Sequence, residues 1–356
     1  MTSIWYEHAR DRTWTSTPPS ADALHFHQNL AGYSPTSLVD LPELADELGV
    51  GRVVAKDESS RFGLPAFKSL GASWAVRRLL RERADDRPVT VVTATDGNHG
   101  RAIAHWARVF GHRAHVVTPA GVHPHATQAI RDEGAKVTTI DGTYDDAVET
   151  ATAVAAAPDH VLVQDTAWDG YERVPGWIVE GYSTLFVELD EQLGAAGLES
   201  VDLIVVTVGV GSLLQAAITH YRRHAGGPAI MAVESDAAAF VAPSLAAGEP
   251  VTVATGATIM AGLNCGTPSS LAWPMMVRGL DAAVTVDDDI VVAAVRDLAA
   301  LGVAAGPCGA AGLAALRIAL GENTVHRRRH LGLNSDSLVV LIVTEGAEAN
   351  PSPGTH

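Results

Sequence analysis

The most informative stretch of the chain reads Lys56-Asp57-Glu58-Ser59-Ser60-Arg61-Phe62-Gly63-Leu64-Pro65-Ala66-Phe67-Lys68-Ser69-Leu70-Gly71. Lys68 stands shortly before Ala72–Arg83, a run whose length and apolar spacing predict a helix. The ε-amine of a lysine can form a Schiff base with a carbonyl carbon. The stretch therefore predicts that Lys68 opens a helix and anchors a carbonyl-bearing cofactor.

A glycine-containing loop, Thr95-Asp96-Gly97-Asn98-His99-Gly100, follows after one helix and one strand. The carboxamide of Asn98 can form a hydrogen bond with a ring hydroxyl. A lysine that opens a helix and faces such a loop is typical of a cofactor anchor. The two features together predict a Schiff base between Lys68 and pyridoxal 5'-phosphate (PLP).

A second glycine-rich loop reads Val206-Thr207-Val208-Gly209-Val210-Gly211-Ser212, and it ends one predicted strand and opens a helix. Backbone N–H groups at a helix start, together with a serine hydroxyl, suit a phosphate group. The loop is not the dinucleotide-binding fingerprint, because Leu214 occupies the position of the third glycine. On its own it indicates only a tight turn, but beside Lys68 and Asn98 it predicts a phosphate-binding loop at the edge of a sheet.

Short β-branched runs alternate with alanine-rich helical runs along the chain. The predicted strands are Arg52–Ala55, Val89–Thr93, Ala114–Thr118, Lys136–Ile140, Val161–Gln164, Leu203–Thr207, Ile230–Val233 and Leu338–Thr344. The predicted helices are Ala72–Arg83, Gly100–Phe110, Thr127–Glu133, Asp145–Ala156, Gly176–Gln192, Leu213–His224 and Asp288–Leu301. This alternation predicts an α/β fold with parallel sheets that are covered by helices on both faces.

Composition indicates an enzyme rather than a binding module. The chain has 356 residues, of which 47% are hydrophobic, so it can bury a large core and divide into two domains. The net charge of −16 argues against a nucleic-acid or anionic membrane surface. The N-terminal residues lack the features of a signal peptide, and no apolar run approaches the roughly 20 residues of a spanning helix, so a cytoplasmic location is expected.

Two further features of composition concern metals and disulfides. His326 and His330 flank three arginines, and this run indicates a solvated face, so no metal site is expected. Cys265 and Cys308 are the only cysteines of the chain. They exclude a disulfide framework, but whether the two pair with each other stays open.

The order of these motifs resembles fold-type II PLP enzymes, the group of the tryptophan synthase β-subunit and threonine dehydratase. Asp-Gly-Asn-His-Gly in the Asn98 loop takes the place of the Ser/Ala-Gly-Asn loop of the commoner dehydratases. This loop and two further stretches narrow the resemblance to the diaminopropionate ammonia-lyases. The two further stretches are Gln164-Asp165-Thr166-Ala167-Trp168-Asp169-Gly170-Tyr171-Glu172 and Ala257-Thr258-Ile259-Met260-Ala261-Gly262-Leu263-Asn264-Cys265-Gly266.

The resemblance implies a role for each matching residue. Lys68 would carry the cofactor, Asn98 would bond its ring hydroxyl, and Thr344 would meet its pyridine nitrogen. Asp96 and Asp165 match the proton-abstracting residues, for the D and the L isomer of the substrate respectively. The phosphate would be held by the second glycine-rich loop, through Gly209, Val210, Gly211 and Ser212.

The resemblance also implies an architecture of two doubly wound open α/β domains with the cofactor in the cleft between them. Residues 1–70 and 178–356 would form the large PLP-binding domain, and residues 71–177 the small α/β domain. Members of the family form dimers, so a homodimer with an amino-acid substrate is expected.

Physical chemistry explains why these residue types suit an elimination. A neutral hydroxyl such as that of Thr344 cannot keep the pyridine nitrogen protonated, so the ring is a weaker electron sink and loss of a β-substituent is favoured over transamination. One base cannot reach both faces of a planar substrate, so two bases would serve the two isomers. A carboxylate desolvated in a closed cleft is expected to have a raised pKa.

One departure from the family leaves the substrate open. The ammonia-lyases carry Glu-Ser-Gly beside the site, whereas this chain has Pro307-Cys308-Gly309, which predicts the loss of a carboxylate and a hydroxyl there. The first interpretation is a PLP-dependent elimination of 2,3-diaminopropionate to pyruvate and ammonia. The alternative is a β-elimination or β-replacement on another β-substituted amino acid, as in serine and threonine dehydratases. A non-catalytic descendant is a third interpretation, against which Lys68, Asp96 and Asp165 argue.

Overall fold

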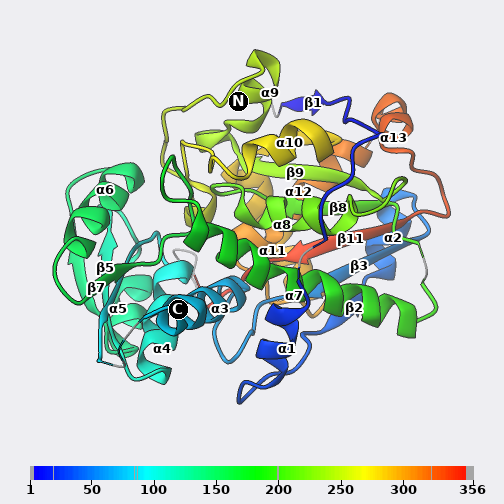
Figure 1. Cartoon of the computed structure of the whole chain (residues 1–356). Coiled ribbons are helices and arrows are strands. Elements are labelled where there is room, and N and C mark those ends of the chain that lie inside the picture. Colours follow the sequence, from blue (N-terminus) through cyan, green and yellow to red (C-terminus); the bar gives the residue numbers. More distant parts are fainter. Residues whose placement is uncertain are drawn as a thin grey trace.

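The computed structural model describes residues 4–18, 20–83, 85, 87–198, 200–321 and 323–349. Strands and helices alternate along this part of the chain, as the sequence predicts (Figure 1). The strands are β1 (Trp5–Glu7), β2 (Leu38–Asp40), β3 (Arg52–Asp57), β4 (Thr90–Ala94), β5 (Arg113–Thr118), β6 (Lys136–Thr139), β7 (His160–Leu162), β8 (Leu203–Thr207), β9 (Ala229–Ser235), β10 (Ala282–Val286) and β11 (Leu338–Val343).

The helices connect these strands and pack on both sheets. They are α1 (Asp22–Gln28), α2 (Pro42–Leu48), α3 (Lys68–Arg81), α4 (Asn98–Val109), α5 (Pro124–Asp132), α6 (Tyr144–Ala155), α7 (Arg173–Ala195), α8 (Ser212–Tyr221), α9 (Val241–Ala247), α10 (Trp273–Gly279), α11 (Asp288–Ala300), α12 (Pro307–Leu320) and α13 (Val325–Leu331), with 3₁₀ turns at Asp236–Ala238 and Ala261–Leu263. None of the described helices is long and apolar enough to cross a membrane.

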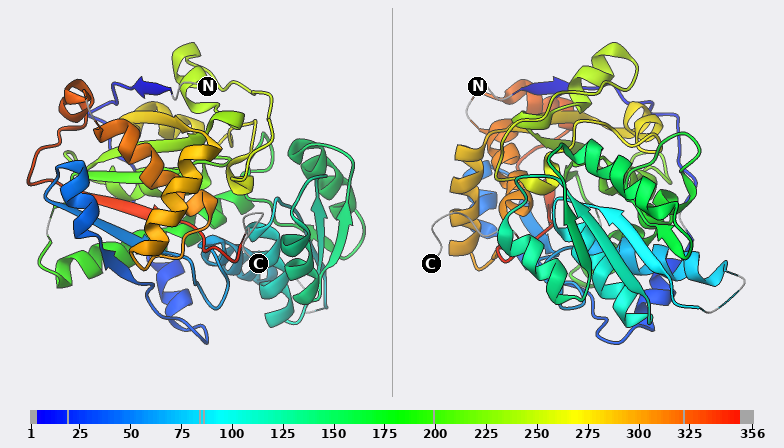
Figure 2. Two further views of the ribbon diagram at one scale, coloured as in Figure 1. Left: turned by 180° about the vertical axis from the view of Figure 1, so that it is seen from behind. Right: turned by 90° about the vertical axis from the view of Figure 1, so that its left-hand side faces the viewer.

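The larger sheet has seven strands in the order β1-β10-β9-β8-β11-β3-β2. Its inner strands, from β10 to β3, are parallel to one another, which confirms the predicted parallel arrangement. The edge strands β1 and β2 pair antiparallel with β10 and β3. Helices cover both faces, and Figure 2 shows α11 and α12 over the face that is seen from behind.

Each inner strand of this sheet divides its side chains between two hydrophobic cores, because successive residues of a strand point to opposite faces. In β11, Val340 and Ile342 belong to the core that α7 and α8 cover, whereas Val339 and Leu341 belong to the core of α12. All six side chains of β11 are buried. This double burial explains why the strand reads as a continuous apolar run.

The smaller sheet has four parallel strands in the order β6-β5-β4-β7. Val91 of β4 and Val116 of β5 belong to the core that includes α3 and α4. Val92 and Val117 face the other way and pack with Ala147 and other residues of α6. The smaller sheet is therefore also covered on both faces, and it lies to one side of the larger sheet (Figure 1).

All four strands of the smaller sheet fall within residues 71–177, the range predicted for the small domain. The proposed boundaries cut two helices, because α3 crosses residue 71 and α7 crosses residue 177. These two helices pack against each other, with Tyr182 of α7 next to Phe67 at the start of α3. The division of the chain at residues 71 and 177 stays a prediction.

The elements that the sequence did not reveal are short or rich in small residues. Strands β1 and β2 have three residues each, too few for an alternating pattern to appear. Strand β10 begins with two alanines, which do not favour a strand. Helix α12 begins at Pro307 and contains Gly309 and Gly312, which lower the helix propensity of the run.

A buried ionic cluster joins β3 to α7. The guanidinium of Arg61 donates hydrogen bonds to Glu58 and Glu188 over 2.6–2.9 Å. Lys56 donates from Nζ to Glu188 Oε2 over 2.9 Å and to the carbonyl of Thr36 over 3.0 Å. These charged side chains are at most 1% exposed. We call Lys56, Glu58, Arg61 and Glu188 the framework cluster.

Candidate active site

A cavity lies where the carboxyl ends of strands from both sheets meet. Segments that follow β4 and β7 bring Asp96, Asn98 and Asp165, and segments that follow β8 and β11 bring Gly211 and Thr344. All residues that the sequence predicted for the site line this cavity. They are Lys68, Asp96, Asn98, Asp165, Gly209, Val210, Gly211, Ser212 and Thr344.

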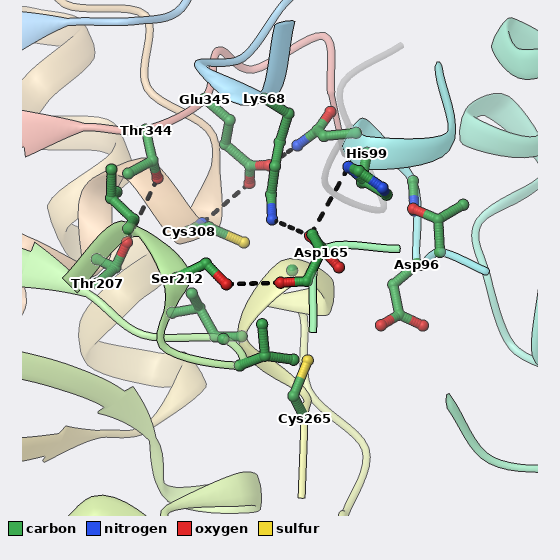
Figure 3. A pocket seen from close by; sticks show the side chains of 18 of the residues that line it. Lys68, Asp96, His99, Asp165, Thr207, Ser212, Cys265, Cys308, Thr344 and Glu345 are labelled. Carbon is green, nitrogen blue, oxygen red and sulfur yellow. Dashed lines mark hydrogen bonds and ion pairs between the residues drawn. The ribbon is translucent and has the colours of Figure 1, made fainter. Parts of the chain in front are cut away.

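Lys68 is the first residue of α3, as predicted, and the end of β11 holds it in place. The backbone N–H of Phe67 donates to the carbonyl of Thr344 over 3.2 Å, and Ala66 forms a β-bridge with Glu345. This pairing fixes the turn before α3, so the Lys68 side chain enters the cavity beside the end of β11. Figure 3 shows Lys68 pointing toward Asp165.

Lys68 and Asp165 form a short ion pair, in which Nζ donates to Oδ2 over 2.6 Å. Burial opposes the positive charge of Lys68, but the Asp165 carboxylate outweighs burial and raises the pKa of Lys68. Burial likewise opposes the negative charge of Asp165, but His99 and Lys68 lower the pKa of Asp165 below its usual range. Asp165 is therefore ionised, and the expected upward shift of its pKa is wrong.

Tyr144 and Gln164 hold the Asp165 side chain, the latter by donating from Nε2 to Asp165 Oδ1 over 3.3 Å, and His99 lies beside it. Tyr144 donates from its hydroxyl to Asp165 Oδ1 over 3.3 Å, and Gln164 Nε2 donates to the Tyr144 oxygen over 2.8 Å. His99 donates from Nε2 to the carbonyl of Val163 over 3.1 Å, and its Nδ1 lies 3.8 Å from Asp165 Oδ2. His99 Nδ1 has no hydrogen-bond partner among the described residues, so this nitrogen is free to meet a bound molecule.

Asp96 stands apart from the pair of Lys68 and Asp165 (Figure 3). Within the described part of the chain, no hydrogen bond or ion pair of its carboxyl group is present. Burial and the negative charge of Asp165 raise the pKa of Asp96 to about 8, and Lys68 only partly offsets this shift. The expected upward shift is therefore confirmed for Asp96, and the two carboxyl groups differ in protonation at neutral pH.

The second glycine-rich loop is shaped to accept an anion. Among the described residues, no protein acceptor is hydrogen-bonded to the backbone N–H groups from Gly209 to Ser212. Gly211 has a φ of +99°, and a Cβ there would lie 2.4 Å from Met276 Cε. A Cβ at Gly209 would lie 2.5 Å from the carbonyl oxygen of Gly262. The loop therefore requires both glycines, and its free donors at the start of α8 fit a phosphate.

Ser212 has a different contact from the one expected. Its hydroxyl donates to the backbone carbonyl of Asp165 over 2.6 Å and so joins the phosphate loop to the Asp165 segment. Thr344 lies at the end of β11, where its hydroxyl is 3.5 Å from that of Thr207. Both threonine hydroxyls line the cavity, and both are neutral. Within the described part of the chain, the Thr344 hydroxyl thus has no carboxylate partner, in line with the sequence prediction.

Sequence reasoning missed Glu345. Its carboxylate accepts hydrogen bonds from Asn98 Nδ2 and from the backbone N–H of Cys308, the latter over 3.0 Å. The loss of the family's glutamate at position 307 stays a prediction, but Glu345, which follows β11, brings another carboxyl group beside Cys308. Its position directly after Thr344, at the end of a buried strand, was the signal that could have revealed it.

The two cysteines both line the cavity and both are free. Burial and nearby carboxyl groups raise the pKa of each thiol well above its ordinary value, so Cys265 and Cys308 are protonated. Cys265 and Cys308 therefore do not form a disulfide in this structure. A thiol at Cys308 stands where the family resemblance predicts a hydroxyl.

The arrangement combines a lysine amine, an anion-binding loop, an ionised carboxylate and a largely protonated one. A lysine can bind a carbonyl compound covalently, and the loop can hold its phosphate. Two carboxyl groups of different pKa can move protons at a neighbouring carbon. The residues present thus fit PLP and acid–base chemistry on a small substrate.

Comparisons with known proteins agree with this geometry. Residues 30–345 match the model of the family described as pyridoxal-phosphate dependent enzyme. The chain is 36% identical to the diaminopropionate ammonia-lyase of Salmonella typhimurium, over 91% of this chain and 88% of that protein. It is 30% identical to the serine racemase of Arabidopsis thaliana, over 70% of this chain and 71% of that protein.

A solved structure of the Escherichia coli diaminopropionate ammonia lyase, in complex with an aminoacrylate-PLP azomethine reaction intermediate, has a TM-score of 0.88 to this chain. The two are 32% identical, and the match covers 98% of this chain and 94% of that one. These matches confirm the predicted fold class, a fold-type II arrangement of two α/β units, and the predicted cofactor, PLP.

Proposed function

The chain belongs to the family of pyridoxal-phosphate dependent enzymes, and on this basis we propose that it is an ammonia-lyase that converts 2,3-diaminopropionate to pyruvate and ammonia. The observation that carries the proposal is the Lys68–Asp165 ion pair in a cavity that also contains a second carboxyl group, Asp96. The Salmonella typhimurium relative, named a diaminopropionate ammonia-lyase, supports this substrate.

Four parts of the cavity would hold the cofactor. Lys68 would bind its aldehyde carbon, Asn98 its ring hydroxyl and Thr344 its pyridine nitrogen. The free backbone N–H groups of residues 209–212 would bind its phosphate. PLP, when bound, supplies an electron sink that acidifies the α-hydrogen of an attached amino acid.

Asp96 and Asp165 act as the two bases for the α-hydrogen. Asp165 is ionised and lies 2.6 Å from Lys68 Nζ, so it can accept a proton beside the anchor point. Asp96, with its pKa raised to about 8, must first ionise. A substrate that carries a β-ammonium group brings positive charge into the cavity, and that charge favours the ionised form of Asp96.

The neutral surroundings of Thr344 favour elimination. Among the described residues, its hydroxyl has only the Thr207 hydroxyl as a hydrogen-bond partner, so no carboxylate of this part of the chain pairs with Thr344 to stabilise a protonated pyridine nitrogen. Loss of ammonia from Cβ and hydrolysis of the remaining enamine give the overall reaction. One diaminopropionate and one water yield one pyruvate and two ammonia molecules.

We further propose that the enzyme is a cytoplasmic homodimer. The family resemblance supports the dimer, and an amino-acid substrate and PLP fit metabolism inside the cell. Sedimentation velocity on the purified protein and fractionation of cells that produce it test these two points.

A substrate screen tests the function. Purified enzyme with PLP should release pyruvate from D- or L-diaminopropionate, with two ammonia molecules for each pyruvate. Serine or threonine, offered at equal concentration, should react more slowly, and a Lys68→Ala variant serves as the control for background hydrolysis. Pyruvate from serine but from neither isomer of diaminopropionate would instead favour the dehydratase-like alternative.

A further inference from the structure

Glu345 is an acid in an unusual place. Its side chain is buried at the end of β11, and the structure records no ion pair with an arginine or lysine for it among the described residues. Burial raises the pKa of Glu345, whereas the thiol and the backbone N–H of Cys308 and the amide of Asn98 act in the opposite direction. A buried acid without a cationic partner is costly to stability, so its contacts need an explanation.

The contacts of Glu345 join three elements. Oε2 accepts from Asn98 Nδ2 at the start of α4, and Oε1 accepts from the backbone N–H of Cys308 at the start of α12. Figure 3 shows a dashed line between the Glu345 carboxylate and Cys308. Because α4 follows the smaller sheet and β11 belongs to the larger one, Glu345 links the two sides of the cavity.

The space around Glu345 is fitted to its side chain. A Cβ at Gly306 would lie 3.1 Å from Glu345 Oε1, and a Cβ at Gly309 would lie 2.6 Å from the Glu345 backbone oxygen. The first turn of α12 therefore approaches closely enough for the backbone N–H of Cys308 to donate to the carboxyl group. Negative charge at a helix N-terminus is favourable.

The link fixes the orientation of Asn98. A carboxamide carries two N–H donors on one end and an acceptor oxygen on the other, and it can turn by 180°. Glu345 Oε2 accepts from Asn98 Nδ2, and this contact holds the orientation in which Nδ2 faces the carboxyl group. One N–H of Asn98 Nδ2 is thereby occupied, and the other remains for a group in the cavity.

We propose that Glu345 is a positioning residue for the cofactor, which holds the Asn98 amide so that Nδ2 donates to the ring hydroxyl of PLP. The inference rests on PLP as the cofactor and not on the identity of the substrate. Cys308 contributes to this arrangement, because its backbone N–H donates to Glu345 Oε1 over 3.0 Å.

A double-mutant cycle on PLP binding tests this role. The full-length variants Glu345→Ala, Asn98→Ala and the double variant are freed of cofactor and titrated with PLP, and the dissociation constant and the visible absorption maximum are recorded. Each single variant should bind PLP more weakly by on the order of tenfold or more, with a shifted maximum. The double variant should bind no more weakly than Asn98→Ala.

Two further variants test whether the effect is specific to the contact between Glu345 and Asn98. Glu345→Gln preserves the side-chain volume but presents an N–H that favours a turned Asn98, so it should show the same loss and shift. Glu234→Gln is the matched control: Glu234 is also buried in the larger sheet and accepts backbone N–H bonds, from Phe240 and Val241, but it does not line the cavity. Its PLP affinity should equal that of the wild type.

Either of two results would overturn the proposal. One is wild-type PLP affinity and absorption in both Glu345 variants. The other is a double variant whose loss equals the product of the two single losses, because independent effects multiply. The two results can still be distinguished if the diaminopropionate assay fails, because PLP binding is measured without substrate.

Discussion

The framework cluster and the active-site cavity contain similar charged groups, but these groups differ in how completely they are paired. In the framework cluster, Glu188 accepts from both Lys56 and Arg61, and Arg61 also meets Glu58, so every charge is paired. In the cleft, Lys68 has one ion pair, with Asp165, while Asp96 has none among the described residues. Fully paired charges stabilise the fold. Charges that are only partly paired remain able to bind a ligand and to exchange protons with it.

Exposure follows the same division. The side chains of the framework cluster are at most 1% exposed, whereas that of Lys68 is 20% exposed and opens on the cavity. A substrate or cofactor can therefore reach Lys68 but not Lys56. Lys56 therefore stabilises the fold, whereas Lys68 is available for chemistry, although both lie in the same stretch of sequence.

The largest expected effect concerns Lys68. Lys68→Ala should lower turnover by on the order of 10³-fold or more, because no other described amine lines the cavity to anchor the cofactor. The visible band of the covalently held cofactor should disappear from the spectrum of the purified variant. A borohydride-reducible adduct that persists in Lys68→Ala would show that another residue is the anchor.

A substitution in the framework cluster should lower the stability of the fold. Glu188→Ala leaves Lys56 and Arg61 buried without a shared partner, so the free energy of unfolding should fall by about 3–5 kcal/mol. Denaturant unfolding with saturating PLP measures the loss, and the exposed Glu43→Ala is the control. A Glu188→Ala protein as stable as this control would remove the distinction between the two regions.

The smallest effect is a pH dependence within the cleft. Asp96, with a pKa raised to about 8, is protonated below that pH, so its base form increases about tenfold between pH 7 and pH 9. The pKa of Asp165 is lowered, so Asp165 stays ionised over this range. The ratio of kcat/KM for the D isomer to that for the L isomer should therefore rise about tenfold. A ratio that stays constant would contradict the assigned protonation of Asp96.

The sequence predicted the position of most site residues because parallel strands deliver their following residues to one edge. Lys68, Asn98, Gly211 and Thr344 each follow or flank a predicted strand or helix, and all line one cavity. The position of Glu345 after Thr344 places it near the cavity, but its contact with Asn98 joins residues far apart in the chain, which a local pattern does not reveal.

The opposite pKa shifts of the two aspartates could not be predicted from sequence. Both residues stand in loops after strands of the smaller sheet, and burial alone raises the pKa of either. Their difference arises because His99 and Lys68, the latter over 2.6 Å, lower the pKa of Asp165, whereas Asp96 has no such ion pair among the described residues. A contact of that kind depends on packing between α3 and the smaller sheet, which a local sequence pattern does not encode.

The most direct test of the account compares the two aspartate variants with the two isomers. Asp96→Asn should lower kcat/KM for D-diaminopropionate by on the order of 10²-fold or more and preserve most activity with the L isomer. Asp165→Asn should show the reverse preference, and both variants should retain bound PLP. Equal losses with both isomers in each variant, or wild-type rates in both, would contradict a site in which two carboxylates serve as separate bases.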